Sequence, residues 1–203
     1  MNEQSTNSIN FVISAAYTFT FANSLFFMLL ADAEKPVSLE NIDLTASKTA
    51  AGLICLTMSL RFFFGNNNYI YAVMIDPSRG PWQKFYQFWF IALQSVILLF
   101  ASYVINQPRV FVATIILLFV VETVWYIMTF VVDPEGVKNN EGDLDMPFLR
   151  AQVTNFLFWA FSVLLYCNLR ESADALMLGV LMIFALNTAY DAWKNMPGYM
   201  GTA

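Results

Sequence analysis

A glutamate lies in the middle of an apolar stretch that is long enough to cross a lipid bilayer. Glu122 falls near the centre of residues 110–132, which are otherwise almost entirely aliphatic, aromatic or threonine. A charged side chain at this depth is costly, so such a residue usually faces other protein or water. We therefore interpret Glu122 as a candidate proton or cation site. The alternative is a structural carboxyl group, either neutral or hydrogen-bonded to a neighbouring helix.

Three further candidates lie in other apolar stretches. Arg61 is close to the expected end of residues 45–64. It either extends to the lipid headgroups or pairs with Glu122 or Asp191 inside a helix bundle. Asn187 and Asp191 are four residues apart and therefore share one face of the last helix. Both are candidates for an ion pathway, and the alternative for Asp191 is anchoring at the membrane interface.

Other polar residues recur at helical spacing, as do small residues that permit close packing. We interpret the polar pairs as hydrogen-bonding contacts between helices rather than ligand sites. The polar pairs are Gln87 with Gln94, Asn155 with Ser162, and Ser14 with Thr18, and the small residues are Ala46, Ala50 and Gly179.

Several kinds of chemistry are excluded by what the chain lacks. It has no histidine, which rules out a His-ligated haem, a His-rich metal centre or a Ser-His-Asp hydrolase. Cys55 and Cys167 have no CxxC spacing and are predicted to be small buried hydrophobic residues. No P-loop, nucleotide-binding, nucleophile-elbow or zinc-protease motif is present. We predict no enzymatic activity, no catalytic residue, no metal and no cofactor.

The composition indicates that the chain is surrounded by lipid. Hydrophobic residues make up 58% and charged residues only 12%, whereas soluble domains carry about 25% charged residues. We predict an all-α integral membrane protein forming one polytopic domain over residues 1–203, a compact bundle of six transmembrane helices. The expected spans, each about 20 residues long, are 9–30, 45–64, 85–105, 110–132, 148–169 and 173–193.

Turn-forming residues separate these spans. The run from Gly65 to Asn68 is predicted to end the second span, and Pro197 with Gly198 the last. Short connections around Asn106–Pro108 and Arg170–Ser172 predict two helical hairpins, spans three with four and five with six. Ser172 is expected to cap the last helix, and Asp133 to close the fourth. Four aromatic residues are predicted to anchor the chain at the interface, namely Tyr69, Tyr71, Trp82 and Tyr86.

Charge distribution predicts the orientation and the partners. With six spans both termini share one side, which would hold Arg61, Arg79, Lys84, Lys138, Arg150 and Lys194, against Lys35, Lys48, Arg109 and Arg170. Because cytoplasmic loops carry more Lys and Arg, we expect both termini in the cytoplasm and the protein in the cytoplasmic membrane. The net charge of −5 and the absence of a basic run exclude nucleic acid as a partner.

Three functions fit these observations. The first is a subunit of an oligomeric channel or gated pore with a cation- or proton-sensitive carboxylate in the membrane. The second is an accessory subunit of a larger membrane complex, with the lipid bilayer and other membrane subunits as partners. The third, a small transporter or intramembrane enzyme, is the weakest, because the two halves of the chain show no inverted repeat.

Overall fold

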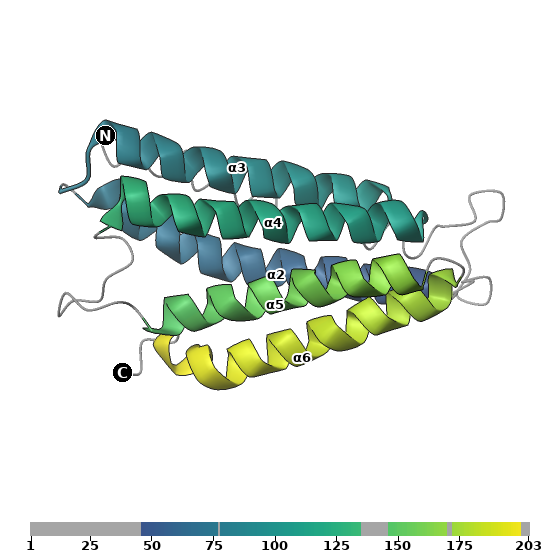
Figure 1. Cartoon of the computed structure of the whole chain (residues 1–203). Helices are drawn as coiled ribbons and strands as arrows, with labels where there is room; N and C mark the ends of the chain where they lie inside the picture. The colour runs from purple at the N-terminus through teal and green to yellow at the C-terminus, as the bar shows by residue number, and fades with distance from the viewer. Residues whose placement is uncertain (1–45, 77, 135–145, 170–171, 200–203) are drawn as a thin grey trace, which may run out of the picture.

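The computed structural model describes residues 46–76, 78–134, 146–169 and 172–199. Within these it describes all side chains except those of residues 46, 63–75, 146–148, 150–151 and 191–199. The described part is all-helical and contains five helices, labelled as in Figure 1. They are α2 (Ala46–Ile75), α3 (Pro81–Tyr103), α4 (Pro108–Val132), α5 (Met146–Asn168) and α6 (Ala173–Tyr199).

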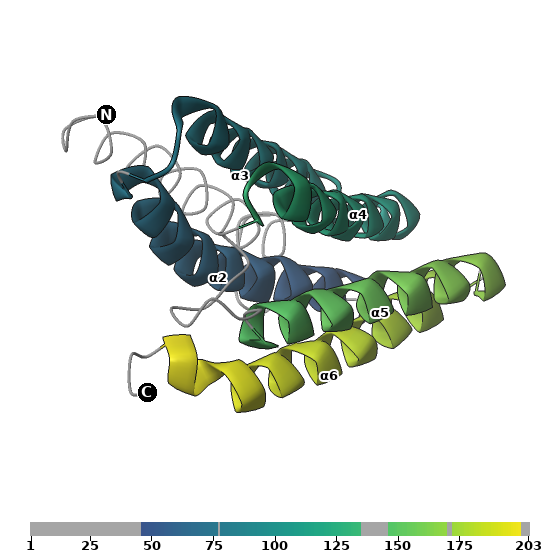
Figure 2. The same ribbon diagram turned by 60° about the vertical axis from the view of Figure 1, so that its left-hand side comes forward.

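Consecutive helices run antiparallel, so α2, α4 and α6 point one way and α3 and α5 the other (Figure 1). The α3–α4 and α5–α6 hairpins lie on either side of the bundle, and α2 packs against both (Figure 2). Each helix contacts the next, and α6 contacts α2. The five helices therefore surround a common interior, where side chains distant in the sequence meet.

Local sequence signals account for the helix ends at the two short connections. Pro108 begins α4 after a turn in which the Gln107 amide donates to the Val104 carbonyl over 2.8 Å. At the start of α6 the Ser172 hydroxyl accepts a hydrogen bond from the Ala175 amide over 3.2 Å. This confirms Ser172 as the N-cap, which satisfies an amide that has no partner within the helix.

Two helices are longer than predicted. Helix α2 does not end at Gly65 but continues through Asn66–Asn68 to Ile75. Helix α6 continues through Pro197 and Gly198 to Tyr199. Intrinsic residue preferences have only a weak influence on where a helix ends, so both helices continue where the residue types alone predicted a stop.

The interior is closely packed and largely apolar. The side chains of Ile54, Leu98, Ile115 and Met177 are at most 1% exposed. Gly179 lets α6 approach α5 closely, since a Cβ atom built there would lie 3.0 Å from Leu165 Cδ1. Helix association in lipid depends on such close contact.

Two predictions about side-chain location are wrong. Cys55 is buried as expected, but Cys167 is exposed on α5, and both are free thiols. Trp82 is exposed near the start of α3, whereas Tyr86 is only 8% exposed and lies inside the bundle. Its hydroxyl finds hydrogen-bond partners on α4, so Tyr86 is not an interfacial anchor.

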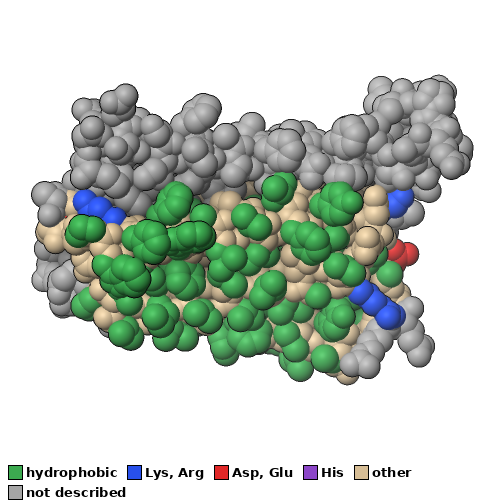
Figure 3. All heavy atoms as spheres, turned by 90° about the horizontal axis from the view of Figure 1, so that it is seen from above, with side chains coloured by type: hydrophobic (Ala, Val, Ile, Leu, Met, Phe, Trp, Pro, Cys, Tyr) green, Lys and Arg blue, Asp and Glu red, His purple; other side chains and the backbone are tan. Residues whose placement is uncertain are grey.

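The outer surface of the bundle is apolar. Figure 3 views it from the side of α3, where hydrophobic side chains cover the middle and Lys and Arg lie toward the two ends. This is the distribution expected for a surface that faces lipid between two aqueous layers. The exposed hydrophobic residues of α3 include Trp82, Phe85, Trp89, Leu93, Val96, Phe100 and Tyr103.

Three of the described helices are long and apolar enough to cross a membrane: α3, α4 and residues Ala173–Tyr190 of α6. The described part of the protein is therefore all-helical, and the protein is membrane-embedded. The first predicted span, residues 9–30, lies outside the described residues, as do Ser14 and Thr18.

Candidate functional site

Four polar side chains from four helices meet inside the bundle, in what we call the Asn155 cluster. Asn155 on α5 donates from Nδ2 to Glu122 Oε1 on α4 over 2.8 Å. Its Oδ1 accepts hydrogen bonds from Arg61 Nη2 on α2, at 3.1 Å, and from Asn187 Nδ2 on α6, at 3.3 Å. Asn155 is 1% exposed and Asn187 7% exposed. The carboxyl group and the guanidinium group are thus joined through one buried amide.

The Asn155 cluster lies halfway along the bundle. Each of its four residues is within about two residues of the midpoint of its helix. Because the helices lie side by side, the cluster is far from either end of the molecule. In a membrane of ordinary thickness this corresponds to the hydrocarbon core, where polar groups need internal partners.

Three of the four residues predicted from sequence are brought together here. Glu122, Arg61 and Asn187 all belong to the cluster. The backbone of Asp191 lies in α6, one turn beyond Asn187, but its side chain lies outside the described residues. Their functional role stays a prediction.

The interpretation of Arg61 as a residue reaching the headgroups is wrong. That prediction placed it near the end of its helix, whereas α2 continues to Ile75 and leaves Arg61 at the midpoint. Its side chain is partly buried and its Nη2 donates to Asn155. Arg61 therefore no longer counts among the charges on the predicted cytoplasmic side, where five remain against four.

Asn155 is the central residue that the sequence analysis did not select as a site. It was expected only to form contacts between helices, together with Ser162. Ser162 instead donates to the Phe158 carbonyl of its own helix. The sequence signal for Asn155 was an amide at the middle of an apolar span, as for Asn187.

A layer of apolar side chains lies one turn from the cluster, always on the side of the α3–α4 turn. It contains Met58, Phe119, Phe158 and Phe184, each three residues from a cluster residue on its helix. All are at most 2% exposed. The ring centroids of Phe119 and Phe158 are 4.5 Å apart, and those of Phe158 and Phe184 are 5.6 Å apart. We call this the apolar layer; it separates the cluster from one end of the bundle.

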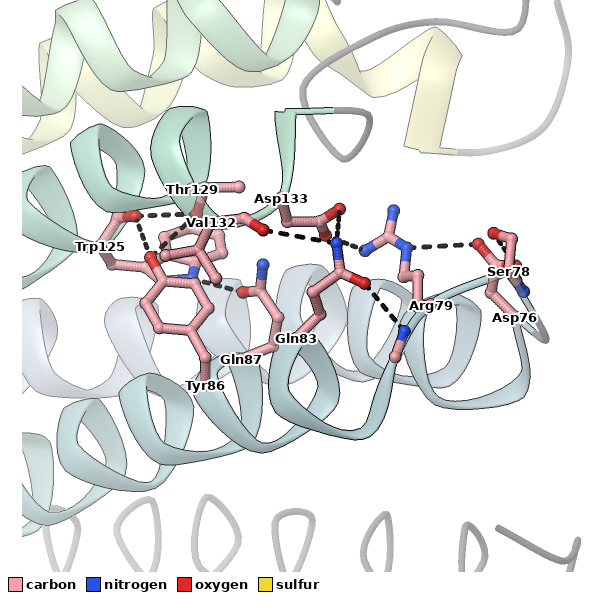
Figure 4. A network of polar contacts seen from close by, with 11 residues as sticks. Asp76, Ser78, Arg79, Gln83, Tyr86, Gln87, Trp125, Thr129, Val132 and Asp133 are labelled. Atoms are coloured by element: carbon pink, nitrogen blue, oxygen red, sulfur yellow. Dashed lines mark hydrogen bonds and ion pairs between the residues drawn. The ribbon is translucent and has the colours of Figure 1, made fainter.

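Polar contacts continue toward the other end. Tyr86 on α3 donates to the Trp125 carbonyl over 2.7 Å, and its hydroxyl lies 3.2 Å from that of Thr129. The indole of Trp125 donates to Gln87 Oε1 over 2.6 Å. These contacts join α3 to α4 (Figure 4).

At that end the α2–α3 loop is fixed to the end of α4, an arrangement we call the loop network (Figure 4). Arg79 Nη1 lies 2.7 Å from Asp133 Oδ2, and Arg79 Nε lies 3.2 Å from Asp76 Oδ2. Gln83 Nε2 donates to the Val132 carbonyl over 3.3 Å. The Asp133 side chain is 1% exposed, so this ion pair is shielded from solvent.

The surroundings of Asp76 in the loop network lower its pKa. Hydrogen bonds from the Ser78 hydroxyl and backbone amide, and then the nearby Arg79, hold the pKa of Asp76 below its usual value of 3.8. Each stabilises the ionised carboxylate. The charge on Asp76 thus helps to order the loop.

The described residues of the site favour binding of water over binding of a metal ion. They contain no group of three His, Cys, Asp or Glu side chains placed to hold a metal ion. The buried oxygen atoms for which the structure shows no hydrogen-bond partner include Asn187 Oδ1 in the cluster and Gln152 Oε1, one turn from Asn155 on α5. Buried polar atoms of this kind are usually satisfied by ordered water. The site offers a carboxyl group, amides and places for water.

Comparison with protein-family models, with curated proteins and with solved structures found no match to this chain.

Proposed function

We propose that the protein is a subunit of a gated membrane pore, with the Asn155 cluster in its pathway and the apolar layer as its gate. The observation that carries the proposal is the stacking of these two layers at the middle of the bundle. Hydrophobic constrictions close pores by excluding water, and polar groups beside them define what passes. The distances in the aromatic contacts fit a closed gate.

The proposed topology is six spans with both termini in the cytoplasm. Helices α2 and α5, with 30 and 23 residues, are long enough to span in addition to the three apolar ones. Residues 9–30 would supply the remaining span. Under this topology the loop network lies on the cytoplasmic side of a cytoplasmic membrane.

We further propose that the pore is a homo-oligomer surrounded by lipid. The exposed apolar surfaces of the bundle favour contact with lipid or with other copies. The alternative is an accessory subunit of a larger membrane complex, in which the Asn155 cluster would only hold the helices together. The mass and composition of the particle, extracted gently from its native membrane, separate the two. A closed homo-oligomer supports the pore, whereas stable co-purification with other chains supports the accessory subunit.

The gate is tested by ion flux into liposomes that contain the full chain. Phe158→Ser places a hydroxyl in the apolar layer and should admit water, raising flux above that of the unmodified protein. Phe156→Ser is the matched control, because Phe156 lies on the same helix but is 46% exposed on the outer face. Size-exclusion profiles establish that both variants remain folded. Equal flux in both folded variants would contradict the proposed gate.

A further inference from the structure

We infer that the Asn155 cluster passes protons and excludes alkali-metal cations. This inference deepens the proposed function and rests on it. It follows from the composition of the cluster. Glu122 is the only carboxyl group that the structure describes at this depth of the bundle, and the guanidinium group of Arg61 belongs to the same hydrogen-bonded cluster. The sequence alone had indicated a preference for cations in general.

Two oxygen atoms of the cluster are already occupied by hydrogen-bond donors. A dehydrated cation needs several oxygen ligands to replace its hydration shell. Asn155 Oδ1 already accepts two hydrogen bonds, from Arg61 Nη2 and Asn187 Nδ2. Glu122 Oε1 accepts another from Asn155 Nδ2. A metal cation would have to displace these donors to bind Asn155 Oδ1 or Glu122 Oε1.

The positive charge of Arg61 also opposes the binding of a metal cation. Guanidinium groups carry a positive charge in proteins, and one amide group separates that of Arg61 from Glu122. A fixed positive charge in a narrow pathway repels cations, and this is one way in which pores exclude them. Arg61 balances Glu122, so no net negative charge remains to attract a cation.

Other charged groups do not restore that attraction at this level. Helices α2, α3, α5 and α6 all pack against α4. On these helices the other charged side chains that the structure describes lie near helix ends, namely Lys48, Lys84 and Asp174. The titratable hydroxyl of Tyr86 bonds to Trp125 and Thr129, one to two turns from Glu122.

A proton needs neither several oxygen ligands nor a net negative charge. The Glu122 carboxylate takes a proton from a hydronium ion on one side. An oxygen lone pair of the carboxylate forms the new O–H bond as an O–H bond of the hydronium ion breaks, which leaves a neutral water molecule. The carboxyl group becomes neutral, and then takes back the lone pair as it releases the proton to water on the other side. Gln152 Oε1 and Asn187 Oδ1 are buried acceptors that can hold such water beside the cluster. The carboxyl group ends each cycle unchanged.

The test is the reversal potential of the Phe158→Ser variant in planar bilayers. We expect it to follow an imposed pH gradient and to stay constant when K⁺ is replaced by Na⁺ or by a large organic cation. A shift with the K⁺ gradient would overturn the inference while leaving the pore in place. The absence of current from any ion would instead overturn the proposed function.

Variants at the cluster provide a second test. Glu122→Gln should lower proton current about a hundredfold, the contribution typical of a positioned proton-transfer group. Asp174→Asn, which removes a carboxylate at the exposed start of α6, should leave it unchanged. Arg61→Gln should admit K⁺, whereas Arg61→Lys keeps the charge and the exclusion. If Arg61→Gln remains folded and still excludes K⁺, selectivity does not depend on the guanidinium and the inference fails.

Discussion

Asn155 donates a 2.8 Å hydrogen bond to Glu122 and thereby joins α5 to α4 at the middle of the bundle. The same amide accepts hydrogen bonds from α2 and α6. A single side chain thus connects four helices, and both Glu122 and Arg61 form hydrogen bonds with it. This relationship leads to the first prediction.

Replacing Asn155 with leucine should destabilise the protein strongly. Leucine has a similar volume but can form none of the three hydrogen bonds, so two charged groups lose a shared partner. Removing one partner from a buried charged network costs about 3–5 kcal/mol. Thermal unfolding in detergent, followed by near-UV circular dichroism, measures the effect.

The control for this variant is Ser162→Ala. Ser162 is fully buried on the same helix, but its hydroxyl bonds only within α5. Its loss should cost no more than about 1 kcal/mol. If both variants lose a similar amount of unfolding free energy, the hydrogen bonds that Asn155 forms between helices do not contribute to stability.

The ion pair between Arg79 and Asp133 should also contribute measurably to stability. Asp133→Ala leaves Arg79, whose side chain is only 15% exposed, without its closest partner, at a cost of about 3 kcal/mol. The double variant Arg79→Leu with Asp133→Ala should cost less than the sum of the single variants. Strict additivity would mean that the two residues are not coupled.

Gly179 should tolerate alanine but not a larger residue. A Cβ atom would lie 3.0 Å from Leu165 Cδ1, the end of a flexible side chain. The better helix propensity of alanine, worth up to about 1 kcal/mol, offsets this crowding. Gly179→Val should separate α5 from α6 and cost about 1–3 kcal/mol. Adding Leu165→Ala to Gly179→Val should recover part of the loss, and no recovery would place the strain elsewhere.

The loop network should weaken in acid because of Asp76. The pKa of Asp76 is lowered in the folded protein, so its contribution is complete above its unfolded pKa of about 3.9. That contribution is lost as the pH falls through the lower, folded value. Hydrogen exchange of residues 78–80 should therefore accelerate below about pH 4.

The matched variant for this prediction is Asp76→Asn, which cannot ionise. Its exchange rates at residues 78–80, corrected for intrinsic pH dependence, should not change across this range. If the unmodified protein and the variant respond alike to acid, Asp76 does not control the loop.

The sequence was informative where the controlling interactions are local. Apolar runs located the described helices. The short connection expected around Asn106–Pro108 and the N-cap expected at Ser172 are both confirmed. Residues 65–68 favour a turn by residue type, but α2 continues through them, because intrinsic preferences of single residues have only a weak influence on where a helix ends. Because the predicted span ended at residue 64, Arg61 was expected near the end of its helix, whereas it lies at the middle.

The candidate site depended on distant contacts. Glu122, Arg61 and Asn187 could each be selected as unusual residues in apolar stretches. Their meeting through Asn155 depends on how four helices are rotated and aligned, and helical periodicity does not determine that. The apolar layer could not be predicted for the same reason, since buried and lipid-facing phenylalanines both lie in apolar stretches of the sequence.

The hydrogen bond between Arg61 and Asn155 also constrains how the protein is made. These residues are 94 positions apart in the chain, and α2 is synthesised long before α5. In the proposed six-span topology the guanidinium of Arg61 must enter the membrane, or stay at its edge, before Asn155 has been synthesised. In that topology the contact that α2 makes through Arg61 forms only after α5 has been synthesised, and chains truncated before residue 146 should expose Arg61 to cellular quality control.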